Sequence, residues 1–207
     1  MGTRTCYDGL RRLDKLGDIM IKRLLVTGYK AHELGIFNDS HEGIPIIKKA
    51  IEIQLRVLLD EDLEWVILGG QQGVETWTAE LILELKDEYP RLQFAIIIPF
   101  LEQEKNWNEQ KKEKYERLLM QADYHTSVTK KPYEAPWQFI ERNKFVVRNS
   151  DGMLVIYDEE NEGSPKFIKK LAEQYAEKND YRIIIIDAYD LQVMAEEIAE
   201  EERNQFL

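Results

Sequence analysis

The sequence predicts a doubly wound α/β fold, in which a mostly parallel sheet carries helices on both faces. Four short runs are almost entirely apolar, at residues 23–26, 65–68, 94–98 and 183–186. Strands that are buried on both faces of a parallel sheet have this composition. Between the runs, apolar residues recur at helical spacing, and the alternation of strand and helix is typical of the same architecture.

Two further strands are predicted, a clear one at 152–158 and a weaker one at 123–129. Each strand is expected to lead into a helix. Ser164 is predicted to cap the fifth of these helices, with Pro165 at its first position. The helices are expected at residues 44–61, 74–88, 108–122, 135–150, 164–180 and 191–205. This order of elements predicts a Rossmann-like fold.

The 207 residues, 43% of them hydrophobic, suffice for one domain with a sizeable core. Residues 20–207 are expected to form that domain. Residues 1–19 have mixed charge and no apolar signal-peptide core, so they are interpreted as a disordered N-terminal extension that ends before Met20. A short helix around Leu10–Leu16 is the alternative.

The net charge of −11 argues against a nucleic-acid binder, because no basic stripe offsets the repulsion from phosphates. One cysteine and three histidines without ligand spacing predict no metal site. No apolar run reaches the roughly 20 residues of a membrane span, so no span is expected. The chain is therefore predicted to be cytoplasmic.

The segment GGQQGVE, at residues 69–75, joins a predicted strand to a predicted helix. Ligands of open parallel sheets bind at the carboxyl ends of the strands. Gly69, Gly70 and Gly73 would let backbone N–H groups approach a phosphate at a helix N-terminus. The alternative is that they only permit close packing of strand and helix. The order of the glycines matches neither the dinucleotide fingerprint nor a P-loop.

Several motifs in order carry a resemblance: TGYK and ELGIF near the first strand, the glycine turn, IIPF with EQEKNW, RN at 142–143, and SDGMLVIYD followed by EGSPK. From about Met20 to about Asp187 the chain resembles the YpsA family of bacterial proteins, also called UPF0398. That family is grouped in the SLOG superfamily with DprA-type and LOG-type proteins.

The resemblance implies a Rossmann-like domain that binds a nucleotide or nucleotide derivative at the strand ends, without a metal. LOG-type enzymes hydrolyse a nucleoside monophosphate and have acidic residues soon after a glycine–threonine turn. Here Pro165, Lys166 and Phe167 follow Gly163 and Ser164, so the hydrolase carboxylates are missing. The ligand-binding residues implied by the matching motifs are Gly28, Tyr29, Lys30, Gly69, Gly70, Gln71, Gly73, Glu75, Trp77, Trp107, Arg142, Asn143, Gly163 and Ser164.

Four of these residues have two interpretations each. Glu75 would accept hydrogen bonds from a ribose hydroxyl, or would only complement the helix dipole. Trp77 would contact the ligand or pack in the core, and its place on an apolar helix face favours the core. Trp107 would stack on a base or only pack against the protein, and its place in a polar loop makes packing alone a weaker explanation. Arg142 would pair with phosphate or with a nearby glutamate.

Three functions stay open at this point. The first is a non-catalytic sensor or regulator that binds a nucleotide-like ligand, with ADP-ribose- and NAD-like compounds as candidates. The second is an enzyme that cleaves a glycosidic or phosphate bond, with Glu75 as acid or base. The third is an interaction protein with a vestigial pocket. The sequence leaves ligand identity, protein partners and oligomeric state open.

Overall fold

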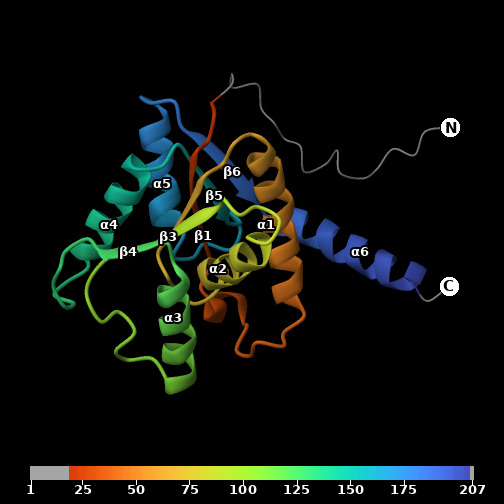
Figure 1. Ribbon diagram of the computed structural model, residues 1–207, viewed down its shortest axis with the longest axis horizontal. Coiled ribbons are helices and arrows are strands. Elements are labelled where there is room, and N and C mark those ends of the chain that lie inside the picture. The colour runs from red at the N-terminus through yellow and green to blue at the C-terminus, as the bar shows by residue number, and fades with distance from the viewer. Residues whose placement is uncertain (1–18, 206–207) are drawn as a thin grey trace.

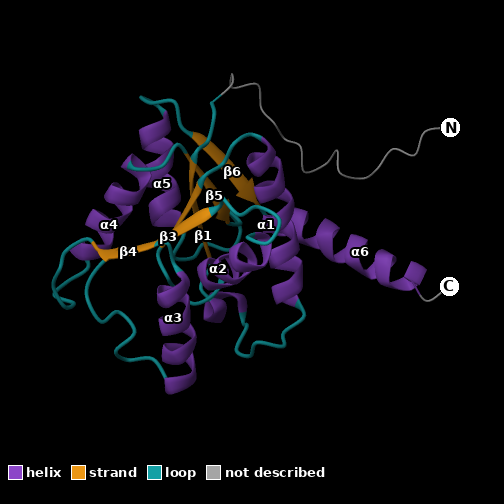
Figure 2. Ribbon diagram, viewed as in Figure 1, coloured by secondary structure: helices purple, strands orange, loops and turns teal. Residues whose placement is uncertain are grey.

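The computed structural model describes residues 19–205, and the sheet in it is six-stranded and parallel throughout, with helices on both sides (Figures 1 and 2). The strands are β1 (Arg23–Gly28), β2 (Trp65–Leu68), β3 (Gln93–Ile98), β4 (Tyr124–Ser127), β5 (Gly152–Ile156) and β6 (Arg182–Ile186). The predicted Rossmann-like architecture is confirmed. The predicted extension lies outside the described residues as far as residue 18.

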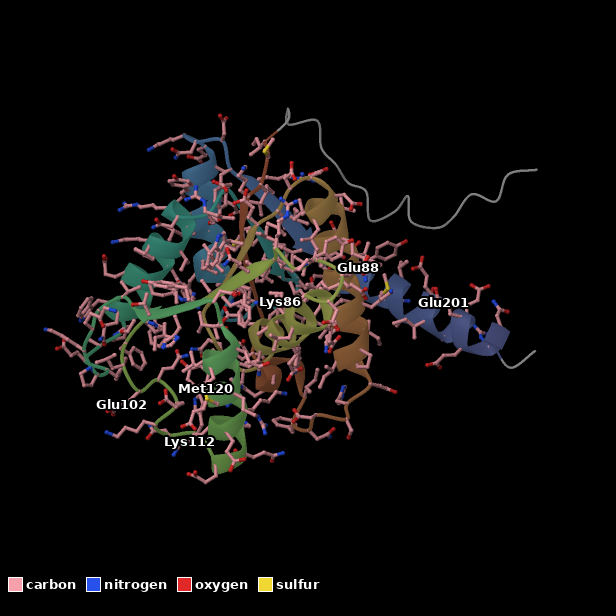
Figure 3. All side chains as sticks on the ribbon, in the orientation of Figure 1. Lys86, Glu88, Glu102, Lys112, Met120 and Glu201 are labelled. Carbon is pink, nitrogen blue, oxygen red and sulfur yellow. The ribbon has the colours of Figure 1, made fainter. Side chains whose placement is uncertain are left out.

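The six predicted helices are also present, with ends that differ from prediction by a few residues. They are α1 (Gly43–Asp60), α2 (Val74–Leu85), α3 (Glu109–Gln121), α4 (Trp137–Arg148), α5 (Lys166–Ala176) and α6 (Ala188–Gln205). A short 3₁₀ turn, Ala31–Leu34, follows β1. The first part of α6 packs against α1, whereas its far end, which carries Glu201, projects beyond the rest of the molecule (Figure 3).

The strand order β4-β3-β2-β1-β5-β6 explains why helices cover both faces. Three successive connections step from β1 towards β4, and the connection after β5 steps the opposite way. Because such crossovers are right-handed, α1, α2 and α3 lie on one face and α5 on the other. The direction reverses between β1 and β5, and the loops after these two strands meet at that switch point.

The core forms around the central strand. Leu24, Leu25 and Val26 of β1 are fully buried between β2 and β5, which both pair with it in parallel. A strand buried on both faces needs apolar side chains on both, and for this reason β1, β2 and β3 could be recognised as uninterrupted apolar runs. For residues 183–186 the inference of burial on both faces was wrong, because β6 is an edge strand and Ile185 is 43% exposed. Tyr124 and His125 of β4 are exposed, as expected at an edge, and the apolar signal of that strand is correspondingly weak.

One local prediction was wrong. The Ser164 hydroxyl does not cap the first turn of α5; it donates to Oε2 of Glu33 at 2.8 Å, and α5 begins after Pro165. The residue that binds Ser164 lies 131 positions earlier in the chain, so nothing in the local sequence indicates the contact.

Candidate functional site

The glycine turn between β2 and α2 allows three close approaches within the chain. A Cβ on Gly69 would lie 1.3 Å from Nη2 of Arg142, so only glycine leaves room for that guanidinium. Gly70 and Gly73 adopt positive φ angles of 71° and 117°, which side chains disfavour. A Cβ on Gly73 would lie 2.5 Å from the backbone nitrogen of Ala31. The turn thereby brings the loop after β1 against the start of α2.

Glu75 is oriented inward, and its side chain is 4% exposed. Oε2 accepts hydrogen bonds from the backbone N–H groups of Gly69 at 3.0 Å and Gln71 at 2.9 Å. Oε1 accepts from the Thr27 hydroxyl at 2.8 Å and lies 3.4 Å from Nη2 of Arg142. The carboxylate therefore holds the glycine turn to the end of β1 and to α4. A contact with a ribose hydroxyl stays a prediction.

Arg142 of α4 contacts the end of β3, its neighbour Asn143 and Glu75 of α2. Its Nε donates to the carbonyl of Ile97 at the end of β3, at 3.2 Å, and its Nη1 donates to Oδ1 of Asn143 at 2.9 Å. With the Glu75 contact, the guanidinium is almost fully engaged and its side chain is 8% exposed. Of the two interpretations of Arg142, the structure shows the ion pair with glutamate.

The loop after β1 is fastened to the loop after β5 at the switch point. The Tyr29 hydroxyl donates to the carbonyl of Asn161 at 2.5 Å and accepts from the N–H of Asp158 at 2.9 Å. Gly163 makes room for the Tyr29 ring, because a Cβ there would lie 2.7 Å from it. We call these contacts, together with those of Glu33 described next, the switch-point latch.

Glu33 contributes the charged part of the latch. Its carboxylate accepts from the backbone N–H of Ser164 at 2.7 Å, from the Ser164 hydroxyl and from the N–H of Lys30 at 2.7 Å. Partial burial would raise the pKa of Glu33, but these hydrogen bonds outweigh it and hold the pKa below its ordinary value. A carboxylate of the chain itself therefore lies beside the start of α5, where an anion is favoured.

A separate cleft of about 230 Å³ opens on the other side of the β1 loop. Trp77 forms part of its lining and is almost fully buried, whereas Phe37 at its mouth is 80% exposed. Trp107 packs edge-on against Tyr115, with ring centroids 5.2 Å apart. The cleft is lined by Ala31, Ile36, Phe37, Asn38, Asp39, Gln72, Gly73, Thr76, Trp77, Trp107, Asn108, Gln110, Lys111, Lys114 and Tyr115.

Two cations and one anion are the charged residues of this lining. Lys114 pairs with Asp39 at 3.4 Å and with Glu80, which lies outside the lining, at 2.7 Å. The Lys111 ammonium forms no ion pair with any described residue. Nε2 of Gln72 is buried and finds no hydrogen-bond partner within residues 19–205. The cleft therefore offers one unpaired cation, whereas the Gln72 amide nitrogen is closed off from solvent.

The predicted site residues fall into three groups. Gly73, Trp77 and Trp107 line the cleft. Tyr29, Lys30, Gly163 and Ser164 lie at or beside the latch. The remaining residues form the support beneath: Gly28 packs against Val74, Gly70 against Tyr115, Gln71 donates to Gln103, and Gly69, Glu75, Arg142 and Asn143 share the buried network.

Sequence reasoning missed Glu33, Phe37, Gln72, Lys111 and Lys114. A partial signal existed for the lysines, which follow Trp107 at the start of α3 and are three residues apart, hence on one helix face. Phe37 is an aromatic residue within a polar loop, which is a similar signal. Nothing comparable marks Glu33, whose partner Ser164 lies 131 positions away in the chain, or Gln72.

Within residues 19–205, no group of three or more histidine, cysteine, aspartate or glutamate side chains is arranged to hold a metal ion. None of the helices described is both long and apolar enough to cross a membrane.

The parallel sheet, the switch point and the glycine turn followed by an acidic residue define a Rossmann-like protein whose candidate site lies at the carboxyl edge. A family model described as the YspA SLOG family matches residues 24–191. This chain belongs to that family.

Relatives match over most of their length. A UPF0398 protein of Lysinibacillus sphaericus is 64% identical over 178 residues, which is 86% of this chain and 99% of the relative. The UPF0398 protein YpsA of Bacillus subtilis is 50% identical over 177 residues, 86% of this chain and 98% of that protein. The family assignment made from the sequence motifs is confirmed.

Proposed function

We propose that the protein is a cytoplasmic sensor or regulator that binds a nucleotide or nucleotide derivative in the cleft between the β1 loop and α3. The observation that carries this proposal is the Lys111 ammonium group, which lines the cleft and forms no ion pair with a described residue, so it is available to an anionic ligand. Membership in the SLOG family supports a nucleotide as the ligand.

The size of the cleft indicates which part of a nucleotide it would hold. Its volume of about 230 Å³ is below the roughly 300–1,000 Å³ of typical small-molecule pockets. A base therefore fits inside, and the sugar and phosphates extend to the rim. Trp107 and Phe37 offer aromatic surfaces on which a base can stack.

The charge of the rim supports an anionic ligand. The whole chain carries a net charge of −11, yet the cleft lining has two lysines and one aspartate. Lys111 has no ion pair with a described residue, so its ammonium group is available to a phosphate. A local positive site in an acidic protein attracts anions selectively.

Binding without turnover is favoured over hydrolysis by the state of the nearby carboxylates. A general acid or base must come within hydrogen-bond reach of the substrate. Glu75 is buried among four internal donors, and Glu33 is bound to Ser164 and Lys30. Asp39 is the carboxylate that lines the cleft, and it is paired with Lys114.

Thermal unfolding with a panel of nucleoside phosphates, NAD and ADP-ribose tests the proposal. A ligand at about 100 times its dissociation constant adds about 2.7 kcal/mol of stability, which raises the melting temperature measurably. We expect at least one member to do so and to be recovered unchanged by mass spectrometry. Recovery of a cleaved product would support the hydrolase instead. No shift from any member would contradict nucleotide binding.

Substitutions of residues that line the cleft test whether the ligand binds there. Lys111→Ala and Trp107→Ala are each expected to weaken binding about tenfold or more, as loss of a charge-assisted bond or of an aromatic contact does. Lys105→Ala is the matched control, because Lys105 is also exposed in the β3–α3 region but does not line the cleft. Equal losses in all three variants would contradict the location.

A further inference from the structure

Helix α4 presents a stripe of polar and aromatic side chains that no other described part of the chain covers. Trp137, Glu141, Lys144 and Arg148 follow one another at spacings of four, three and four residues. This spacing places them on one face of the helix, and we call this stripe of four residues the seam. α4 lies at one side of the molecule, next to α5 (Figure 1).

Large apolar side chains on and beside this seam are exposed. Trp137 is 43% exposed, and Ile140 and Phe145, which flank the seam on opposite sides, are 53% and 42% exposed. The opposite face of α4 is buried through Gln138, Arg142 and Val146. One helix face thus holds the fold together, and the other leaves three large apolar residues in solvent. Contiguous exposed apolar surface of this kind marks interaction sites.

An apolar groove extends the same surface. It has a volume of about 190 Å³ between α4 and strands β1 to β4, and Phe145 of α4 is part of its lining. Tyr124, at the edge of the sheet, also lines it and is 53% exposed. Phe145, which flanks the seam, thus connects the seam to the groove. A stable interface needs about 800 Å² from each partner, which one helix face alone seldom supplies.

The charges of the seam are complementary to those of the same seam turned end to end. If a second α4 lies antiparallel about a two-fold axis near residues 142 and 143, position 141 faces 144 of the other copy and position 137 faces 148. Glu141 then faces Lys144, and Trp137 faces Arg148. Both contacts are favourable, the first as an ion pair and the second as a cation–π contact.

The Arg148 side chain is available for such a contact. Its guanidinium group forms no ion pair, hydrogen bond or ring contact with another residue in the described part of the chain. Glu141 and Lys144 form an exposed ion pair with each other at 2.8 Å, which contributes little to the stability of the monomer. In the interface, Glu141 and Lys144 would each contact the opposite charge of the second copy and so stabilise the dimer.

We propose that two copies of this chain associate through α4, antiparallel and about a two-fold axis, along the seam Trp137–Glu141–Lys144–Arg148. A two-fold interface is self-complementary, so each contact occurs twice. Glu141 of each copy pairs with Lys144 of the other. Ile140 and Phe145 cover the two edges of the seam. The surface is separate from the cleft between the β1 loop and α3, so both can be occupied at once.

Charge reversal followed by sedimentation analysis tests the proposal. Glu141→Lys and Lys144→Glu each place like charges opposite one another at two points of the dimer, and each should raise the dissociation constant of the dimer about tenfold or more. In an equimolar mixture of the two variants, every seam pair is again of opposite charge. We therefore expect the wild type to have the mass of a dimer, each variant alone that of a monomer, and the mixture that of a dimer.

Recovery of the dimer in the mixture shows that both variants are folded. The monomeric mass of each variant alone is then not a result of misfolding. Glu102→Lys and Lys105→Glu reverse another exposed pair of the same i, i+3 spacing and should leave the wild-type dimer unchanged. A monomeric wild type would overturn the proposal. So would single variants that stay dimeric, or a mixture that stays monomeric.

Discussion

Nη2 of Arg142 lies 3.4 Å from Oε1 of Glu75, and both side chains are buried, with exposed fractions of 8% and 4%. The two residues are 67 positions apart and come from different helices, Glu75 from the N-terminus of α2 and Arg142 from the middle of α4. Glu75 in turn binds two backbone N–H groups of the glycine turn. The geometry of the turn, and hence one wall of the cleft, depends on this buried ion pair.

Replacement of the cation is predicted to destabilise the fold. Arg142→Ala is expected to lower the free energy of unfolding by about 3–5 kcal/mol, because it leaves the buried carboxylate of Glu75 without its positive partner. Urea denaturation measures the change. Arg182→Ala is the control, since the Arg182–Glu61 pair is more exposed and should contribute only about 0–1 kcal/mol. An equally small loss in both variants would contradict the prediction.

Glu75→Gln is predicted to act mainly on stability. The glutamine amide retains one acceptor oxygen. Its NH₂ group replaces the other carboxylate oxygen and therefore faces groups that donate hydrogen bonds to that oxygen in the wild type. A loss of about 1–3 kcal/mol in the free energy of unfolding is expected, measured without ligand. If unfolding is unchanged while nucleotide affinity falls tenfold, Glu75 contacts the ligand and the stability argument is wrong.

Gly69→Ala tests the close approach of the turn to Arg142. The added Cβ would occupy a position 1.3 Å from Nη2, so the guanidinium must move away from Glu75. Overpacking of this kind typically costs about 1–3 kcal/mol, and loss of the ion pair adds to it. Gly43→Ala is the matched variant, because its Cβ would meet nothing nearer than 3.1 Å. Calorimetric unfolding should show a clearly larger loss for Gly69→Ala.

The latch predicts a pH dependence that Glu33→Gln removes. Because hydrogen bonds lower the pKa of Glu33 in the folded state below the ordinary 4.5, its contribution is present above that pH. The contribution is lost as the pH falls through the folded pKa, where the carboxylate becomes protonated. The melting temperature of the wild type should therefore exceed that of Glu33→Gln at neutral pH, and the difference should shrink below about pH 4.5.

Burial would raise the pKa of Asp151, but hydrogen bonds with Arg23 and Lys22 lower it below its ordinary value, so Asp151 also contributes to the loss of stability in acid. Comparison of two proteins that both contain Asp151 cancels its contribution. A difference between wild type and Glu33→Gln that stays constant from neutral to acid pH would show that the ionised carboxylate does not hold the latch.

The sequence by itself determined the fold and much of the buried support of the site. A strand buried on both faces requires uninterrupted apolar residues, so β1, β2 and β3 were visible as apolar runs. The equally apolar β6 was found as a strand, but it lies at an edge of the sheet and is only partly buried. Gly69, Gly70 and Gly73 stood out because a strand-to-helix turn seldom needs three glycines. Gly70 and Gly73 have positive φ angles, a local backbone requirement that a sequence pattern can indicate. Gly69 does not, and its need for glycine comes from Arg142, which the local sequence does not indicate.

Only the tertiary structure decided what the predicted residues touch. The family resemblance placed Trp107 and Ser164 in one set of ligand-binding residues. In the structure Glu33 of the β1 loop binds Ser164, whereas Phe37 of the same loop lines the cleft that contains Trp107. The carboxylate of Glu75 is oriented inward because Arg142 approaches it from a distant helix. Contacts across 67 or 131 positions depend on how the layers of the fold pack, and no spacing along the chain records that arrangement.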